Sequence, residues 1–185
     1  MITRVAAPRL SGCLVVNGMP GSGKTTVTRL IADLLPRAAL LRSGYVAELV
    51  VSGRVWALGE PRSEARRQQL LTNRNMCMLA NNFAAEDITP VLDYALFSRE
   101  LLDLTLAQLT RPVMVVMLAP GLKICQDRNA ARDDDERLDF DYSPLEAELD
   151  REVGGVGWWF DTSALTADET AARIIRDAPH RAVVG

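Results

Sequence analysis

The sequence of 185 residues predicts a single α/β domain spanning 1–185, in which helices cover both faces of a mainly parallel sheet. Short apolar runs alternate with longer amphipathic segments, which is the pattern of βαβ units. The run at 113–118 is apolar throughout, as expected for a central strand buried on both faces. Between an apolar run and an amphipathic segment, residues 18–25 read G-x-x-x-x-G-K-T, which predicts a strand, a phosphate-binding loop and a helix in that order.

The first half of the chain is predicted to contain two strands and three helices. Apolar residues at helical spacing follow the phosphate-binding loop and continue as far as Pro36, where a new apolar run begins. Pro61 marks the start of a long amphipathic segment. The expected elements are 13–17 (strand), 24–35 (helix), 38–42 (strand), 45–52 (helix) and 62–86 (helix).

The second half adds three strands and four helices by the same alternation. Pro112 and Pro120 mark the boundaries of the central apolar strand. Thr166 followed by Glu169 is a capping box, which predicts the start of the last helix. The expected elements are 89–93 (strand), 98–110 (helix), 113–118 (strand), 121–132 (helix), 143–153 (helix), 157–161 (strand) and 166–177 (helix).

Composition excludes several classes of partner. With 48% hydrophobic residues, the chain can bury the core of one ordinary domain. The net charge of −3, without a basic patch, argues against a nucleic-acid partner. No apolar run reaches transmembrane length and the N-terminal residues contain no secretory signal, so no membrane partner is expected. We expect a monomer or a homodimer, since exposed apolar positions at 45–52 or 62–86 could support a dimer.

The numbers and positions of the cysteines and of the histidine limit the kinds of catalytic site that the chain can form. Cys13, Cys77 and Cys125 are odd in number, widely scattered and set in apolar surroundings, so they are expected to be reduced core residues of a cytoplasmic protein. His180 is the only histidine in the sequence and lies near its end, where we expect a solvated tail. A catalytic triad built on histidine is therefore excluded.

The loop at 18–25 is expected to hold the phosphates of a nucleoside triphosphate. Glycines let the backbone wrap closely around an anion and turn its N–H groups inward, and the following helix directs the positive end of its dipole to the same place. Lys24 would contact the β- and γ-phosphates, Thr25 would ligate Mg²⁺, and Thr26 would contact the α-phosphate side. The expected cofactor-binding residues are Gly18, Gly21, Ser22, Gly23, Lys24, Thr25 and Thr26.

An acidic residue ends the strand expected at 89–93. A carboxylate at the carboxyl end of a strand beside a phosphate-binding loop can hold Mg²⁺ through its water shell, which makes Asp93 and Thr25 the candidate metal ligands. The alternative is that Asp93 only caps the turn that follows.

Arginines further along the chain are candidates for charge stabilisation during phosphoryl transfer. Arg128 and Arg132 are four residues apart and share one face of a predicted helix, from which they could close over a triphosphate. The alternative is pairing with Asp127 or with the acidic run that follows. In the helix at 62–86, a stripe of Arg67, Arg74 and Asn81, with Arg66 and Asn73 beside it, either faces solvent or lines an acceptor pocket. The apolar face of this helix is expected at Leu71, Met78 and Ala85, with Leu70, Cys77 and Ala84.

With these features the chain resembles the small P-loop kinases that phosphorylate hydroxyl groups of metabolites or antibiotics, most of all the chloramphenicol-phosphotransferase, zeta-toxin and shikimate-kinase-like group. The resemblance covers nearly the whole chain. It rests on Gly18–Thr25, the strand end at Asp93, Leu118-Ala119-Pro120 followed by Arg128-x-x-x-Arg132, and Phe160-Asp161-Thr162-Ser163-x-Leu165-Thr166.

The resemblance implies the three-layer P-loop NTPase fold, with a five-stranded parallel sheet in the order 2-3-1-4-5. It implies ATP and Mg²⁺ as cofactors, a small-molecule acceptor, and a mobile lid at about 127–145 that closes before transfer. In this group the loop at 160–166 lies near the adenine.

The chain departs from this group after the second strand. Such kinases usually place an aspartate there to orient and deprotonate the acceptor hydroxyl, whereas this sequence has Gly44 at the corresponding position. Glu48, one helical turn on, could reach the acceptor instead, or Asp93 could serve both as metal-shell ligand and as base. Transfer could also proceed without a base, or it could have been lost while nucleotide binding remained.

The leading hypothesis is therefore an ATP- and Mg²⁺-dependent kinase for a small-molecule hydroxyl, such as an antibiotic or another specialised metabolite. The candidate catalytic residues are Lys24, Glu48, Asp93, Arg128 and Arg132. One alternative is a nucleoside or nucleotide kinase that uses the arginines of the helix at 62–86 as phosphate clamps. The other is a nucleotide-binding regulatory protein without turnover, which the glycine at position 44 would explain.

Overall fold

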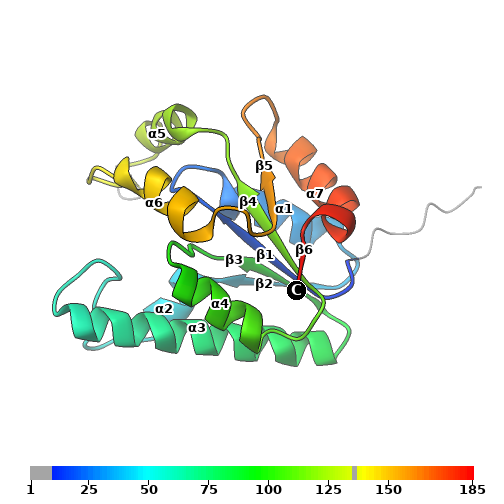
Figure 1. Ribbon diagram of the computed structural model, residues 1–185, viewed down its shortest axis with the longest axis horizontal. Coiled ribbons are helices and arrows are strands. Elements are labelled where there is room, and N and C mark those ends of the chain that lie inside the picture. Colours follow the sequence, from blue (N-terminus) through cyan, green and yellow to red (C-terminus); the bar gives the residue numbers. More distant parts are fainter. Residues whose placement is uncertain (1–9, 135–136) are drawn as a thin grey trace, which may run out of the picture.

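The computed structural model describes residues 10–134 and 137–185. Parallel strands form its sheet in the order β2-β3-β1-β4-β5, as the resemblance to the small P-loop kinases implied (Figure 1). A short strand that was not predicted, β6, pairs antiparallel with the start of β4. The strands are β1 (Cys13–Gly18), β2 (Ala38–Arg42), β3 (Thr89–Asp93), β4 (Val113–Leu118), β5 (Trp158–Phe160) and β6 (Val183–Val184).

Helices pack on both faces of this sheet, which gives three layers (Figure 1). Side chains alternate between the two faces along each strand. On β1, Cys13 and Val15 pack in the cluster that contains residues of α3 and α4, and Leu14 and Val16 pack in the cluster of α1 and α7. The helices are α1 (Lys24–Leu34), α2 (Ser43–Glu48), α3 (Arg62–Ala85), α4 (Arg99–Gln108), α5 (Leu122–Ala130), α6 (Pro144–Val153) and α7 (Ala167–Arg181).

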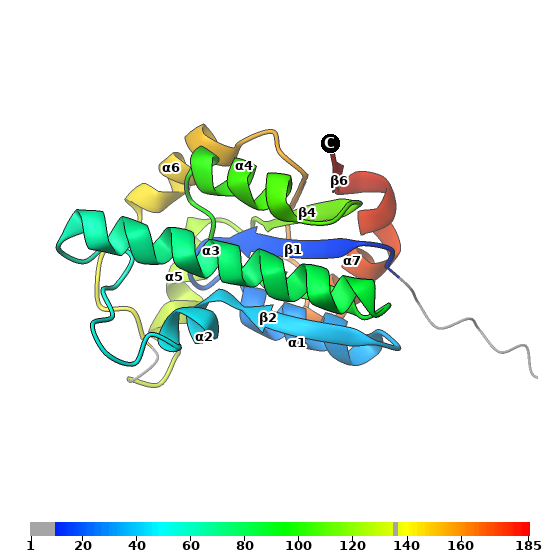
Figure 2. The same ribbon diagram turned by 90° about the horizontal axis from the view of Figure 1, so that it is seen from below.

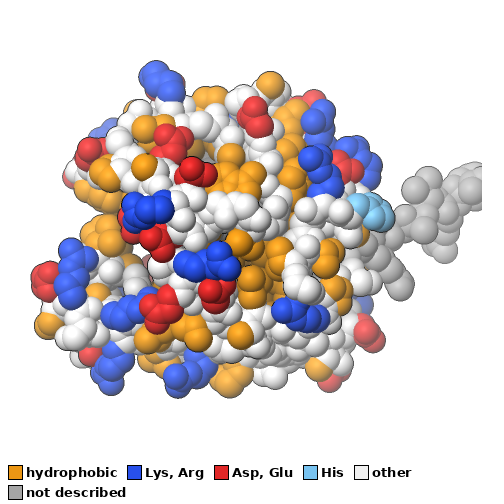
Figure 3. Space-filling view, viewed as in Figure 1, with side chains coloured by type: hydrophobic (Ala, Val, Ile, Leu, Met, Phe, Trp, Pro, Cys, Tyr) orange, Lys and Arg blue, Asp and Glu red, His pale blue; other side chains and the backbone are white. Residues whose placement is uncertain are grey.

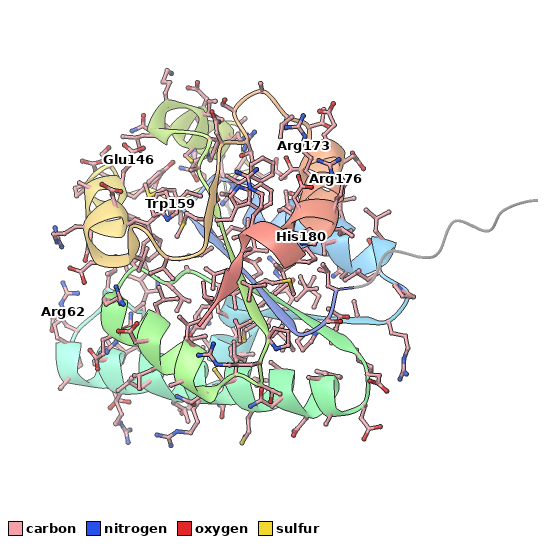
Figure 4. All side chains as sticks on the ribbon, turned by 45° about the vertical axis from the view of Figure 1, so that its right-hand side comes forward. Arg62, Glu146, Trp159, Arg173, Arg176 and His180 are labelled. Carbon is pink, nitrogen blue, oxygen red and sulfur yellow. The ribbon has the colours of Figure 1, made fainter. Side chains whose placement is uncertain are left out.

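Two helices, α2 and α7, have ends that differ from the predicted ones by up to four residues. α2 begins two residues before the predicted start and ends at Glu48, so the chain from 49 to 61 is a loop rather than the end of a helix. α7 keeps the predicted capping box at Thr166 but continues through Arg181. His180 is therefore an exposed residue of the last helical turn, not of a tail (Figure 4).

The apolar face of α3 was predicted only in part: the expected stripe of Leu70 and Cys77 packs against the core, whereas the expected stripe of Leu71 and Met78 does not. Met76, Cys77 and Ala80 are buried against the sheet, whereas Leu71 and Met78 are exposed. The neighbouring stripe that contains Asn73 and Ala80, which was expected to be polar, is also buried. Asn73 is buried because its Oδ1 accepts hydrogen bonds from Tyr94 Oη at 2.9 Å and Thr105 Oγ1 at 2.7 Å. A polar residue thus lies on the packed face because the neighbouring segments satisfy it.

Strand register brings the carboxyl ends of three strands together. Asp93 pairs with Val16 of β1 on one side and with Arg42 of β2 on the other. In parallel sheets this edge is where ligands bind. In Figure 2, α3 runs along the sheet with α2 close to its first half, and the loop between α2 and α3 projects beyond the ends of the strands. Across the described residues, no helix has the length and apolar character needed to span a membrane.

A side-chain amide fastens the segment after β3 to β1. Asn17 is buried; its Nδ2 donates to Leu96 O at 2.7 Å and its Oδ1 accepts from Leu96 N at 2.9 Å. Leu96 is itself fully buried, so these two backbone groups depend on the amide for hydrogen bonding.

We predict that Asn17→Ala lowers the free energy of unfolding by about 2–4 kcal/mol, because each unsatisfied buried polar group costs ~1–3 kcal/mol. Asn81→Ala is the matched control, since Asn81 also makes two backbone hydrogen bonds, to Gln108 O and Thr110 N, but at the surface. Its cost should be about 1 kcal/mol or less. Chemical denaturation measures both, and equal costs would contradict the role given to Asn17.

Candidate functional site

The loop between β1 and α1 is shaped to surround an anion. Gly23 is the N-cap of α1 with φ 96°, and within the described residues no side chain caps this helix. The N–H groups of its first turn therefore remain available to a ligand. Gly21 has φ 78°, and a Cβ there would lie 2.2 Å from Cys125 O, so only glycine allows α5 to approach the loop this closely.

Lys24 lies over this loop. Its Nζ donates hydrogen bonds to Gly18 O at 2.8 Å and Met19 O at 2.9 Å. Burial lowers the pKa of Lys24 to about 8, although the negative charge of Asp93 acts in the opposite direction. The ammonium group is thus held at the cradle by groups that a phosphate oxygen could replace, and in a setting that favours an anionic partner.

Thr25 and Asp93, the two predicted metal ligands, are in contact. Thr25 Oγ1 in the first turn of α1 donates to Asp93 Oδ2 at the end of β3, at 2.7 Å. The carboxylate is buried, with 7% of Asp93 exposed. Hydroxyl and carboxylate oxygens are ligands that Mg²⁺ prefers. The described residues contain no cluster of three His, Cys, Asp or Glu that could hold a metal, so a cation here would complete its shell with phosphate and water.

Arg42 is a site residue that the sequence analysis missed. Its Nε lies 3.6 Å from Asp93 Oδ2, its Nη1 donates to Tyr45 Oη at 2.6 Å, and its guanidinium lies over the Tyr45 ring, 4.3 Å from the centroid. A usable signal existed: two neighbouring parallel strands were expected to end at Arg42 and Asp93, which places these residues side by side. The contact with Arg42 also distinguishes Asp93 from a residue that only caps a turn.

Both candidate lid arginines lie near the loop. Arg128 Nη1 donates to Ser22 O at 3.1 Å. The positive charge of Arg132, just beyond α5, contributes to lowering the pKa of Lys24, so it too is close. The alternative partner of Arg128, Asp127, pairs instead with Lys123 at 2.5 Å. Residues 135–136 of the expected lid lie outside the described residues, as do residues 1–9.

A cavity of about 300 Å³ adjoins the phosphate cradle. It lies between the start of α1, Arg128 and the segment that leads into α7. Two buried hydroxyls, Ser22 Oγ and Thr162 Oγ1, have no hydrogen-bond partner within the described residues. Buried hydroxyls normally have hydrogen-bond partners, and a polar ligand in this cavity could satisfy both of these. The lining residues are Ser22, Gly23, Thr26, Val27, Arg128, Thr162, Leu165, Thr166, Ala167 and Thr170.

The structure places Glu48 away from this group. It is exposed at the end of α2, where Arg54 Nη1 lies 3.6 Å from its Oε1. Gly44 is also exposed, and a Cβ on it would meet no atom within 4 Å. Position 44 therefore has room for a side chain, and its being glycine is not imposed by packing.

The polar stripe of α3 serves packing and surface pairing. Arg66 pairs with Glu100 of α4, and Arg67 pairs with Glu64 at 2.9 Å on the same helix. Asn81 bonds to the backbone at the end of α4, as described above. Arg67 and Arg74 also line a cavity of about 590 Å³ together with residues of the segment 50–53, so part of this stripe borders a pocket as well as making surface ion pairs.

Aromatic side chains connect the loop before α3 with the segment that leads into α6. The Trp56 and Phe140 rings meet edge to face with centroids 5.4 Å apart, and Phe140 meets Tyr142 at 6.0 Å. Tyr142 in turn donates its hydroxyl hydrogen to Cys125 O at 3.2 Å. Trp56 remains 57% exposed. Figure 3 shows the surface hollowed on the left, between α6 and the loop before α3, with hydrophobic side chains at the edge of the hollow.

The outer side of α7 carries no part of this site. Arg173, Arg176 and His180 lie along its surface, on the side away from α5 and α6 (Figure 4). Arg176 pairs with Asp177 at 2.7 Å. Glu146 of α6 instead contacts the base of α5, where its Oε1 accepts from Leu122 N at 3.1 Å.

Comparison with known proteins identifies the family and the fold of the chain. A family described as the AAA domain matches residues 14–151, and among curated proteins none matches significantly. A sugar kinase from Janibacter sp. HTCC2649 has 16% identity and a TM-score of 0.67 over 90% of this chain and 94% of its own. The tunicamycin resistance protein of Deinococcus radiodurans has 16% identity and a TM-score of 0.66 over 95% and 99%. Shikimate kinase from Acinetobacter baumannii has 20% identity and a TM-score of 0.58 over 89% and 91%. The chain therefore belongs to the AAA domain family and has the P-loop fold found in small-molecule kinases.

Proposed function

We propose that this protein is an ATP- and Mg²⁺-dependent kinase that transfers the γ-phosphate to a hydroxyl group of a small molecule. The observation that carries the proposal is the convergence of Lys24, the Thr25–Asp93 pair and Arg128 around the uncapped start of α1. A structural loop would not need these cationic, acidic and backbone groups at one point.

Each of these residues has a role in holding the donor. Lys24 would exchange the loop carbonyls for β- and γ-phosphate oxygens, and the first-turn N–H groups of α1 would donate to the phosphates. Thr25 and Asp93 would hold Mg²⁺, which when bound supplies charge neutralisation between the phosphates. The nucleoside would occupy the cavity lined by Thr162. Arg128 and Arg132 would stabilise charge on the transferring group from a lid at about 127–145.

The acceptor side works without a dedicated base in this proposal. Glu48 pairs with Arg54 on the surface, and Asp93 is engaged by Thr25 and Arg42. Phosphoryl transfer through a loose transition state depends mainly on positioning and electrostatic stabilisation. Such a site can operate with glycine at position 44.

The acceptor is proposed to enter between the loop at 49–61 and the lid, where Trp56 and Phe140 meet. Aromatic faces favour a ring-bearing, neutral molecule. Three arginines of this loop and of the start of α3 have acidic partners, which makes these three less suited to be the phosphate clamps that a nucleotide kinase needs. Their ion pairs are Arg54–Glu48, Arg62–Glu60 and Arg66–Glu100. The names of the similar structures, a sugar kinase and a tunicamycin resistance protein, suggest hydroxylated sugars and antibiotics as first acceptors to try.

Incubation with Mg-ATP and a panel of neutral sugars, hydroxylated antibiotics and nucleoside monophosphates tests the proposal. We expect acceptor-dependent ADP formation with a neutral acceptor. Formation only with nucleoside monophosphates would favour a nucleotide kinase instead. Tight ATP binding without turnover across the panel would favour a regulatory nucleotide-binding protein.

We predict that ADP affinity in the presence of Mg²⁺ falls about tenfold between pH 7 and pH 9. Lys24 with a pKa of about 8 is mostly protonated at pH 7 and mostly neutral at pH 9, and phosphate binding favours the protonated form. Calorimetric titration at several pH values measures this. Lys24→Met should bind more weakly and lose the pH dependence; a flat profile for the unmodified protein would contradict the role of Lys24.

We predict that Gly44→Asp folds, with stability unchanged or raised by up to about 1 kcal/mol, because an acidic residue suits the first turn of α2. Any kinase activity should be unchanged or raised, since a positioned base contributes ~10²–10⁴-fold. Initial rates with the acceptor from the panel measure this. Glu48→Gln should retain activity; a large loss in that variant would restore Glu48 as the base.

We predict that Trp56→Ala raises the KM for the acceptor about tenfold and leaves Mg-ADP affinity unchanged, because the aromatic face is lost while the donor site is intact. Leu58→Ala, in the same loop and also exposed, is the control and should leave KM unchanged. If Trp56→Ala lowered only the melting temperature, its contact with Phe140 would be purely structural.

A further inference from the structure

Arg42 is paired with the same Asp93 carboxylate that a metal ion at this site would contact. Asp93 Oδ2 accepts the hydrogen bond from Thr25 and lies 3.6 Å from Arg42 Nε. That separation is an ion pair rather than a hydrogen bond. A buried carboxylate needs a compensating positive charge, and without a metal Arg42 supplies one.

The other end of the guanidinium is held on α2. Its Nη1 donates to Tyr45 Oη at 2.6 Å and its carbon lies 4.3 Å from the centre of the Tyr45 ring. The Arg42 side chain is 28% exposed, so one side of it is open. Arg42 is two residues before Gly44 at the end of β2, and β3 lies between β2 and the strand that leads into the phosphate loop. α2 follows Arg42 and continues into the loop at 49–61, where the acceptor is proposed to enter.

A divalent cation bound by Thr25 and Asp93 would change the forces on Arg42. With a cation bound there, the charge of Asp93 would be neutralised and the Arg42 guanidinium would be repelled, so the attraction between Arg42 and Asp93 would be lost. By thermodynamic reciprocity, if the cation weakens the Arg42–Asp93 pair, that pair weakens binding of the cation by the same factor.

We propose that Arg42 competes with Mg²⁺ for Asp93 and, once released, donates N–H groups to the γ-phosphoryl group from the acceptor side. The proposal rests on the nucleotide site described above. In the transfer itself, the bond between the γ-phosphorus and the ADP oxygen breaks and a bond from the acceptor hydroxyl oxygen forms. The hydroxyl proton leaves to solvent, and Arg42 exchanges no proton. Arg42 thus contributes to the transfer rate by stabilising charge, whereas an acidic residue at position 44 would contribute to it by acting as a base.

The first test measures the Mg²⁺ concentration that gives half-maximal ADP binding. In Arg42→Gln this concentration should fall about five- to tenfold, because the competing cation is gone. Arg54→Gln removes a positive charge from the same side of the molecule, at its pair with Glu48. It should leave the Mg²⁺ requirement unchanged; an equal shift in both variants would make the effect one of net charge and overturn the proposal.

The second test uses ADP with aluminium fluoride as a mimic of the transferring phosphoryl group. The unmodified protein should bind ADP more tightly when aluminium fluoride is present, and Arg42→Gln should lose at least tenfold of that gain. Arg42→Lys keeps the charge and should retain a Mg²⁺ requirement close to that of the unmodified protein, which keeps the test usable if the glutamine variant does not fold.

The outcomes separate this proposal from the proposed function. If the unmodified protein does not bind Mg-ADP, the nucleotide site itself is wrong. If it binds but Arg42→Gln has an unchanged Mg²⁺ requirement, or keeps the full gain from aluminium fluoride, the proposal for Arg42 is overturned while the kinase assignment stands.

Discussion

A buried carboxylate, Asp93, is the constraint on which the candidate site depends. A charge in this position is stable only if neighbours compensate it. The register of the sheet provides them, because β1 leads into the helix that carries Lys24 and Thr25, and β2 ends at Arg42. Strand order, loop sequence and charge balance are therefore parts of one arrangement. The backbone pairing of the strands sets the positions of their ends. The site residues at these ends are therefore positioned by the sheet and not only by their own flexible side chains.

Much of the fold follows from patterns that act over a few residues. The alternation of apolar runs and amphipathic segments predicted the five parallel strands, and the motif at 18–25 predicted the turn between β1 and α1. β6 escaped prediction because two residues that pair with an existing strand leave no periodic signal. The packed face of α3 was predicted only in part because Asn73 looks polar in sequence, whereas Tyr94 and Thr105, distant along the chain, satisfy it when buried.

As with the fold, the site residues that could be predicted are those that carry a local sequence pattern. Residues of the phosphate loop carry a motif, and Asp93 ends a recognisable strand, so both could be found. Arg42 belongs to no motif. It matters because it lies beside Asp93 at the end of the neighbouring strand, and this can be predicted only when the strand order is known. Glu48 was a reasonable candidate by helical spacing, but the shorter α2 and its partner Arg54 place it at the surface. The orientation of a side chain at a helix end depends on where that helix stops, and this is the least predictable property of a sequence.

The close approach of Gly21 to Cys125 O has a mechanical consequence. Because the backbone of α5 rests directly against the phosphate loop, that helix cannot swing as a rigid arm without separating from the loop or pulling it along. A lid that opens would therefore have its hinge after Cys125, and Arg128, between this anchor and the end of α5, would move less than Arg132. Arg128 would then stay in place beside the phosphate loop while Arg132 moved with the lid, although only four positions separate them in the sequence.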